Sequence, residues 1–286
     1  MKIGFIGAGK TGFTLGKYFV DHGVLVSGYF SRSMESAEKA AAFTGTAYFD
    51  TLEDILSASG ILFLTVPDTA ITEVWNRLKM LPIQNKRICH CSGLMSSADF
   101  TGIDECQAFG YSIHPLFAIA SKTESYKKIE QAVFTIEGSK EHLCCFQQLF
   151  ERLGNQVCII SPDQKVKYHG AAVFLSNHVT ALAHIGCKLL SECGFEDEFN
   201  KVVLNTLFLN NCKAIAKNGT ANALTGPVER NDFTTIKKHM DCFSKKEKLL
   251  YSLLSRQLVD VAKEKHTETD YSDIEMFLDS VQEERD

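Results

Sequence analysis

The sequence predicts a doubly wound α/β domain followed by an all-helical domain. Before residue 162, short β-branched or aromatic runs alternate with amphipathic stretches, a pattern typical of βαβ units and a parallel sheet. From residue 165 onward the apolar residues follow a helical period, and no further strand is expected. A chain of 286 residues is long enough for two domains of ordinary size. We therefore expect domains at 1–161 and 162–286.

The expected strands are the runs 2–9, 24–30, 60–67, 87–93, 108–115 and 132–138. The helices expected between them span 12–22, 36–43, 52–58 and 69–78. In the second half, the pattern predicts one long helix over 165–193, which Gly194 ends, and another over 198–217. A polar segment at 220–232 precedes helices over 233–242, 245–265 and 272–281, and we expect a solvated acidic end at 282–286.

Composition points to a globular protein with a small-molecule partner. The chain is 45% hydrophobic and 23% charged, with a formal net charge of −5. It has no stripe of Lys and Arg with interleaved aromatic residues, so we expect no nucleic-acid partner. It also lacks a run of about 18 apolar residues, and its first apolar run reaches glycines at once, unlike a signal peptide. These features predict a cytoplasmic protein without a membrane span.

The cysteines predict neither disulfides nor a metal site. The sequence contains ten cysteines but no C-x-x-C pair. Cys89 and Cys91 flank His90, yet in a strand the imidazole faces away from both thiols. We therefore expect reduced cysteines that behave as small apolar residues.

A glycine motif joins the first expected strand to the first expected helix. The segment reads Gly7-Ala8-Gly9-Lys10-Thr11-Gly12, which is a G-x-G-x-x-G sequence. In this context Gly7 permits a tight turn, Gly9 lets a pyrophosphate approach the backbone, and Gly12 lets the helix pack on the strand. The helix N-terminus then offers free N–H groups to the phosphates. The motif predicts a Rossmann dinucleotide site.

The end of the second strand predicts which dinucleotide is bound. NAD sites carry an acidic residue there, which bonds the ribose 2′-hydroxyl. This chain instead has Ser31, Arg32 and Ser33, a cation between two hydroxyls. A guanidinium suits a phosphate monoester, so the segment favours NADP(H) over NAD(H). The alternative is a solvated loop arginine.

Loops after the later strands supply further candidates, because ligands bind at the carboxyl ends of the strands. Val66 and Pro67 follow one strand and are expected to border the cofactor, while Asp68 is either part of the site or simply a helix start. Ser92 follows the next strand and is expected to reach the nicotinamide ribose or carboxamide. His114 precedes a proline, which holds it extended and directs its imidazole toward the same edge, unless it is only a structural turn.

These motifs occur in a fixed order with KVKYHGAAVFLSN and TGPVERND, and together they resemble a bacterial family. Its members have an N-terminal Rossmann-like domain and a C-terminal domain of unknown function. The family is similar to a larger group of pyrroline-5-carboxylate reductases, 6-phosphogluconate and β-hydroxyacid dehydrogenases, ketopantoate reductases and deazaflavin-dependent NADP oxidoreductases. The resemblance implies a helical second domain like the C-terminal domain of 6-phosphogluconate dehydrogenase, and a homodimer formed through the helices. One departure is Asn231, where relatives tend to have glycine.

One face of the expected long helix carries Lys165 and His169, and Tyr168 and Asn177 flank this face. The resemblance implies that a lysine on this helix, sometimes with an asparagine, polarises or protonates the substrate carbonyl as hydride arrives. This offers Lys165 or His169 as the proton donor, with His114 and Asn177 as further catalytic candidates. The alternative is a structural lysine and a histidine hydrogen-bonded between the domains.

The polar segment of the second domain supplies candidates for substrate binding. Thr225 and Arg230 lie where a loop is expected to close over a substrate. The guanidinium of Arg230 suits a carboxylate or phosphate. The alternative is that Arg230 pairs with Asp232 or Glu229 and holds the loop.

These features together predict an NADP(H)-dependent oxidoreductase that acts on a small carbonyl, imine or hydroxy acid. Two alternatives stay open: an NADP-binding sensor or interaction protein without turnover, and a deazaflavin-dependent NADP oxidoreductase. The apolar stretch 202–215 supports the expectation of a homodimer formed by the helical half.

Overall fold

The computed structural model describes residues 2–283 and consists of two compact units, Met1–His178 and Val179–Asp286. The boundary predicted at residues 161/162 lies just after the last strand of the sheet. The two units instead divide after His178, beyond the next helix, α6 (Lys165–Phe174). This helix belongs to the first unit because Lys165 is buried against the sheet. The last three residues of the expected acidic end lie outside the described residues.

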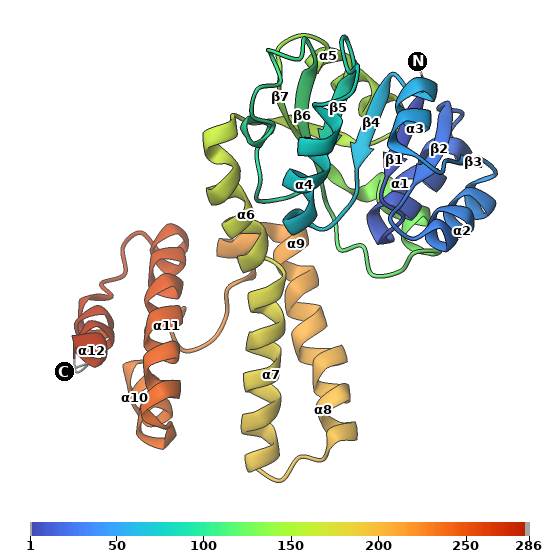
Figure 1. Cartoon of the computed structure of the whole chain (residues 1–286). Coiled ribbons are helices and arrows are strands. Elements are labelled where there is room, and N and C mark those ends of the chain that lie inside the picture. Colours follow the sequence, from blue (N-terminus) through green and yellow to red (C-terminus); the bar gives the residue numbers. More distant parts are fainter. Residues whose placement is uncertain (1, 284–286) are drawn as a thin grey trace. The chain divides into compact units, whose positions relative to one another are not determined.

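The first unit is built on an eight-stranded sheet with the order β3-β2-β1-β4-β5-β6-β7-β8 (Figure 1). Its strands are β1 (Ile3–Ile6), β2 (Val26–Phe30), β3 (Ala47–Tyr48), β4 (Ile61–Leu64), β5 (Arg87–His90), β6 (Phe109–Leu116), β7 (Val133–Gly138) and β8 (Gln156–Ile159). The order reverses beside β1, as in a doubly wound fold, which confirms the predicted fold class.

The sheet is parallel, as predicted, except at one pair, where β7 runs antiparallel to β6. The segment between these strands holds only short 3₁₀ turns, so it supplies no crossover helix to return the chain in the parallel direction. As a result the amino end of β7 lies beside the carboxyl end of β6, and Thr135 lies opposite His114.

Helices cover both faces of the sheet. One core contains Phe13 and Phe19 of α1 (Lys10–Asp21), small residues of α2 (Met34–Thr44), and Phe146 and Phe150 of α5 (Leu143–Arg152). The other core contains residues of α3 (Leu52–Ala58) and α4 (Asp68–Leu78), with Trp75 fully buried. Helices α1, α2 and α4 follow parallel strands and direct their N-termini to the carboxyl edge of the sheet, whereas α5 follows the antiparallel β7 and begins at the opposite edge.

The remaining helices are α7 (Asn177–Glu192), α8 (Asp197–Val203), the π-helical turn η5 (Leu204–Phe208), α9 (Leu209–Ala223), α10 (Phe233–Cys242), α11 (Lys245–Lys265) and α12 (Ser272–Glu283). The predicted helices at 233–242 and 245–265 coincide with α10 and α11. No strand occurs after β8 in the described part of the chain.

The single helix predicted over 165–193 is wrong, because the chain breaks between α6 and α7. The Ser176 hydroxyl donates back to the Ala172 carbonyl at 2.6 Å, and the Ser176 amide bonds to Val173 instead. Such back-bonding competes with the helical ladder. The helix predicted over 198–217 is likewise interrupted by η5, and Gly219 leaves helical geometry with φ 78°.

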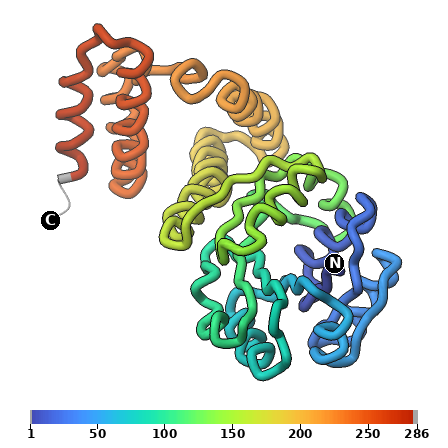
Figure 2. Tube along the Cα trace, turned by 90° about the horizontal axis from the view of Figure 1, so that it is seen from above, coloured from blue at the N-terminus to red at the C-terminus, as the bar shows by residue number. Residues whose placement is uncertain are grey.

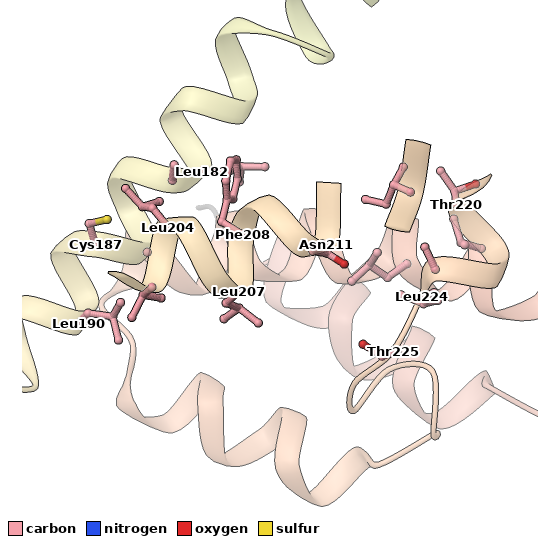
Figure 3. Close-up of a pocket in the computed structure, with 17 residues that line it drawn as sticks. Leu182, Cys187, Leu190, Leu204, Leu207, Phe208, Asn211, Thr220, Leu224 and Thr225 are labelled. Carbon is pink, nitrogen blue, oxygen red and sulfur yellow. The ribbon is translucent and has the colours of Figure 1, made fainter. Parts of the chain in front are cut away.

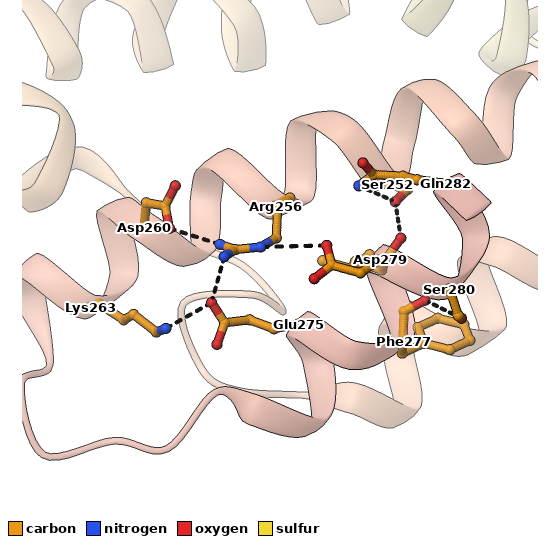
Figure 4. Close-up of polar contacts among 10 residues, drawn as sticks. Ser252, Arg256, Asp260, Lys263, Glu275, Phe277, Asp279, Ser280 and Gln282 are labelled. Carbon is orange, nitrogen blue, oxygen red and sulfur yellow. Dashed lines mark hydrogen bonds and ion pairs between the residues drawn. The ribbon is translucent and has the colours of Figure 1, made fainter.

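Helices α10–α12 form a small core of their own, in which Ile236, Ile274 and Leu278 are fully buried. In both views α11 and α12 lie side by side (Figure 2). Arg256 of α11 forms ion pairs with Asp260 and with Glu275 of α12 at 2.8 and 2.9 Å (Figure 4). These exposed pairs add to a helix hairpin that apolar packing already holds. No helix among the described residues is long and apolar enough to cross a membrane.

Candidate functional site at the carboxyl edge of the sheet

The three motif glycines differ in what the fold demands of them. Gly7 has φ 114°, and a Cβ there would lie 2.8 Å from the backbone of Thr65. A Cβ at Gly12 would lie 2.5 Å from the Gly7 carbonyl oxygen, so a larger residue would push α1 off the sheet. A Cβ at Gly9 meets only the Thr65 carbonyl, at an ordinary 3.6 Å. The packing of the protein therefore does not require glycine at position 9.

The N-terminus of α1 is free to bind an anion. Gly9 is the N-cap, no side chain caps the helix, and its first turn has no acidic residue. Its first N–H groups therefore have no partner within the helix. Ala8 is buried, while Lys10 is exposed and Thr11 partly buried at the same turn. A pyrophosphate fits this donor set.

The segment after β2 presents an unpaired cation. Arg32 is exposed and forms no ion pair within residues 2–283. Glu35, the nearest acid in sequence, pairs with Lys39 at 2.5 Å. Ser33 caps α2 by accepting the Ser36 amide at 3.3 Å, and Ser31 is partly buried beside it. The guanidinium is thus available for a phosphate at the same sheet edge as the glycine loop.

Lys165 of α6 is buried against the ends of β5 and β6. Lys165 is 1% exposed, and its Nζ donates to the Ser92 carbonyl and to Ser112 Oγ, both at 2.8 Å. Burial lowers the pKa of Lys165, while the carboxylate of Glu137 acts in the opposite direction. The ammonium thus fixes α6 to two neighbouring strands and places a positive charge between them.

Two histidines, His114 and His169, lie close to Gly93 and form a polar cluster with Lys165. A Cβ at Gly93 would lie 2.7 Å from His169 Cδ2 and 3.0 Å from His114 Nε2, so glycine is what lets both rings approach this loop. His114 Nδ1 lies 2.7 Å from the Tyr168 hydroxyl. Burial, together with the neighbouring Lys165, lowers the pKa of His114 to about 4. This imidazole is therefore neutral at neutral pH.

His90, at the end of β5, is a second neutral imidazole and is fully buried. The Ser92 amide donates to its Nδ1 at 3.3 Å, and Nε2 lies 3.1 Å from the Ser96 carbonyl. Burial lowers the pKa of His90 to about 4. Its two bonds shape the loop that carries Ser92.

The acids near the cluster are engaged in internal hydrogen bonds. Asp68, at the start of α4, accepts from Ser92 Oγ at 2.6 Å. The amides of Leu94 and Met95 also donate to this hydroxyl, so Ser92 organises its own loop. Glu137 is 1% exposed and accepts from the Ser97 amide and hydroxyl at 2.7 and 2.6 Å. Burial raises the pKa of the Glu137 carboxyl.

The other predicted residues form no hydrogen bond with this cluster within the described part of the chain. Val66 is partly buried, and Pro67 is exposed as the N-cap of α4 at the same sheet edge. Asn177 is exposed and starts α7, beyond the break in the helix. Thr225 and Arg230 belong to the second unit. No three His, Cys, Asp or Glu side chains gather as metal ligands within residues 2–283, and all ten cysteines are free.

Thr225 lines a cavity of about 660 Å³ in the second unit (Figure 3). Apolar side chains of α7, η5 and α9 surround it, including Leu182, Leu204 and Leu207. The pairing expected for Arg230 is absent in the described chain: Glu229 binds Lys265 and His266, and Asp232 caps α10 through Thr235. The Arg230 side chain is exposed.

Sequence reasoning missed the residues that support the cluster. Ser112 and Glu137 lie opposite each other across the antiparallel pair, which the sequence did not predict. Gly93 looked like an ordinary loop glycine. These three residues were hard to predict because each acts through a residue that is distant in sequence.

Two family models match the chain. Residues 2–88 match NADP oxidoreductase coenzyme F420-dependent, and residues 132–258 match a domain of unknown function, DUF2520. This confirms the predicted combination of a Rossmann-like domain with a C-terminal domain of unknown function. The DUF2520 match begins in the sheet, before β7, and so includes the antiparallel strand and α6.

Solved structures show the same fold over nearly the whole length. Protein TM1727 from Thermotoga maritima is 26% identical with a TM-score of 0.74, covering 92% of this chain and 99% of that one. A putative NADP oxidoreductase, BF3122 from Bacteroides fragilis, is 21% identical with a TM-score of 0.69 and coverages of 91% and 98%. An imine reductase from Myxococcus stipitatus in complex with NAD⁺ is 14% identical with a TM-score of 0.59 and coverages of 99% and 92%. A search of curated proteins found no significant match.

Proposed function

We propose that the protein is an NADP(H)-dependent oxidoreductase that reduces or oxidises a small carbonyl, imine or hydroxy acid. The observation that carries this proposal is Gly9, a glycine at a helix N-terminus that the packing does not require. A buried lysine and two histidines lie at the same edge of the sheet, beyond β5 and β6. An anion loop and a polar cluster on one edge are what hydride transfer to a bound substrate needs.

The glycine loop and the N-terminus of α1 would hold the pyrophosphate, and Arg32 with its flanking serines would hold the 2′-phosphate. Val66, Pro67 and Ser92 would border the rest of the cofactor from the loops after β4 and β5. When bound, the nicotinamide supplies or accepts a hydride. Because the guanidinium of Arg32 has no ion-pair partner within residues 2–283, its charge is available for that phosphate.

The histidines and Lys165 would supply the electrostatics. His169 is partly buried beside Gly93, where its imidazole can serve as a general acid or base, so we assign the proton transfer to it. Lys165 is too buried to touch a substrate in this structure, and it acts by fixing the Ser92 loop and by its charge. Thr225 and Arg230 are proposed as substrate contacts from the second unit, with Asn177 as an accessory donor.

The test begins with calorimetric titration of the full chain with NADPH, followed by NADPH absorbance in the presence of keto acids, ketones and cyclic imines. We expect binding and NADPH consumption with at least one class. Failure of NADPH to bind at millimolar concentration would reject the proposal. Binding without turnover across the whole panel would favour the sensor or interaction protein instead.

The match at residues 2–88 favours one second candidate, an exchange of hydride between NADP(H) and coenzyme F420. Adding F420 to protein and NADPH tests this directly through the absorbance of the deazaflavin. Loss of that absorbance would assign the second function. An unchanged spectrum, with turnover of a carbonyl or imine, would leave the first.

A further inference from the structure

The two nitrogens of His114 have contrasting surroundings. Nδ1 lies 2.7 Å from the Tyr168 hydroxyl, and the two rings meet edge to face at 5.7 Å and 81°. Nε2 has no hydrogen-bond partner within residues 2–283. This nitrogen is not fully buried. One nitrogen is therefore fixed inside the protein, and the other is open to a ligand beside Gly93.

The hydroxyl of Tyr168 is the better donor of this pair. A phenol is a stronger acid than a neutral imidazole N–H, and a bare imidazole nitrogen is a stronger base than a phenol oxygen. The O–H of Tyr168 therefore points at Nδ1. A neutral imidazole carries one proton, so that proton lies on Nε2.

The surroundings oppose a second proton on His114. Lys165 lies within 5.6 Å of the centre of the Tyr168 ring, and His169 and His90 also neighbour the imidazole. Burial and these groups lower the pKa of His114 to about 4. The two acids nearby are engaged, Glu137 with Ser97 and Asp68 with Ser92.

We propose that Tyr168 is a positioning residue that holds His114 as the Nε2–H tautomer, and that this N–H donates a hydrogen bond to a carbonyl oxygen of the substrate. The inference rests on the proposed function and narrows its substrate class to carbonyl compounds rather than protonated imines, because a buried ammonium beside a neutral donor repels a cationic substrate. His114 polarises the carbonyl and gives up no proton. An N–H that is fixed before binding costs no reorganisation when charge develops on the oxygen.

Nitrogen NMR of the full chain labelled at histidine tests the role of Tyr168 without any substrate. A His114→Gln variant identifies the signal of His114. We expect a single Nε2–H tautomer at neutral pH, with Nδ1 at the shift of a hydrogen-bonded bare nitrogen. In Tyr168→Phe the signals should move toward an imidazole exchanging between its tautomers. An imidazolium, an Nδ1–H tautomer, or an unchanged spectrum in Tyr168→Phe would overturn the assignment.

The chain provides a matched control for this experiment. His239 Nδ1 lies 2.9 Å from the Tyr251 hydroxyl in the second unit. Tyr251→Phe removes an equivalent hydroxyl and should change the signals of His239 while leaving those of His114 in place. If both variants disturbed His114 equally, the effect would be global and the proposal would fail.

Two rings of equal size test the substrate class. Cyclopentanone presents a carbonyl oxygen, and pyrrolidinium presents a cation. Each is titrated into the free protein and into protein at saturating NADP⁺ while the Nε2–H signal of His114 is followed. We expect a shift with cyclopentanone only. No shift with either ring, or a larger one with pyrrolidinium, rejects the acceptor role, whereas failure of NADP⁺ to bind rejects the proposed function and leaves the tautomer result standing.

Discussion

At the scale of single residues, we expect Arg32 to govern the choice of cofactor. Its exposed guanidinium would bond the 2′-phosphate that NADPH has and NADH lacks. Replacing it by alanine should weaken NADPH binding by about 1.5–3 kcal/mol, the range for hydrogen bonds to charged groups, and leave NADH nearly unaffected. Calorimetric titration with both cofactors measures this difference.

Arg77→Ala is the matched control for Arg32. Arg77 is also exposed, but it lies in the last turn of α4, at the opposite edge of the sheet. This variant loses the same charge and should bind NADPH normally. Equal affinities for NADPH and NADH in the unmodified protein would contradict the assignment of the 2′-phosphate site.

The buried imidazole of His90 links stability to pH. Its pKa is about 4 in the folded protein and 6.5 when exposed, so the unfolded chain binds the extra proton first as the pH falls. Stability is full above the unfolded value and is lost between it and the folded value. The loss from His90 should reach about 2 kcal/mol on going from about pH 7.5 to about pH 5.

Urea unfolding at these two pH values tests this prediction. In His90→Gln, which cannot titrate, the fall in unfolding free energy between them should be smaller by about that amount, about 2 kcal/mol. His114 should still contribute its own part, since its pKa is also about 4. An identical fall in both proteins would show that His90 does not carry the effect.

At the scale of elements, the loop between β1 and α1 separates stability from binding. Gly12→Ala would force a Cβ to 2.5 Å from the Gly7 carbonyl oxygen and should destabilise the protein by about 1–3 kcal/mol. Gly9→Ala meets only an ordinary contact at 3.6 Å and should fold with nearly unchanged stability. It should nevertheless bind NADPH about tenfold or more weakly, about 1.4 kcal/mol, because the methyl group occupies the path of the pyrophosphate.

Thermal unfolding and NADPH titration of both glycine variants provide the comparison. If Gly9 is needed for the approach of the pyrophosphate, Gly9→Ala should fold normally but bind NADPH weakly. Normal NADPH affinity in that variant would remove the observation on which the proposed function rests.

Several elements could be predicted from the sequence because their signals are local. The span of α3 follows from Thr51 as its cap and from three buried apolar residues at helical spacing. The direction of β7 could not be predicted in this way, because it depends on what the intervening segment does in three dimensions. The break after α6 could not be predicted because the apolar period runs through it without interruption. The local feature at the break is a single hydroxyl, that of Ser176.

At the scale of the whole molecule, the helices of the second unit lack a core of their own over α7–α9. Helix α7 has no buried residue, and Leu207 and Val202 are 71% and 56% exposed. Helices without a buried face are only marginally stable in water, so a partner must cover them whenever the chain folds. A second copy is always available in the required amount, and we therefore predict a homodimer formed through these helices and the cavity in Figure 3.

Sedimentation at micromolar concentration tests the oligomeric state. Leu207→Asp places a charge on the apolar face and should weaken the dimer or cause it to dissociate. Lys237→Asp, at an exposed position of α10, is the control and should leave it intact. A monomer in the unmodified protein would contradict the prediction.

The sequence by itself determined the Rossmann class, the phosphate loop, the candidate arginine and the helical second half. Each depends on residues close together in the chain, where backbone conformation and periodicity are set by local sterics. Only the tertiary structure decided that Lys165 bonds Ser92 and Ser112, that Tyr168 contacts His114, and that Asn177 is exposed. These contacts join segments that are distant in sequence. Their geometry depends on the strand order and on one antiparallel pair, and the burial that results sets the charge of each group.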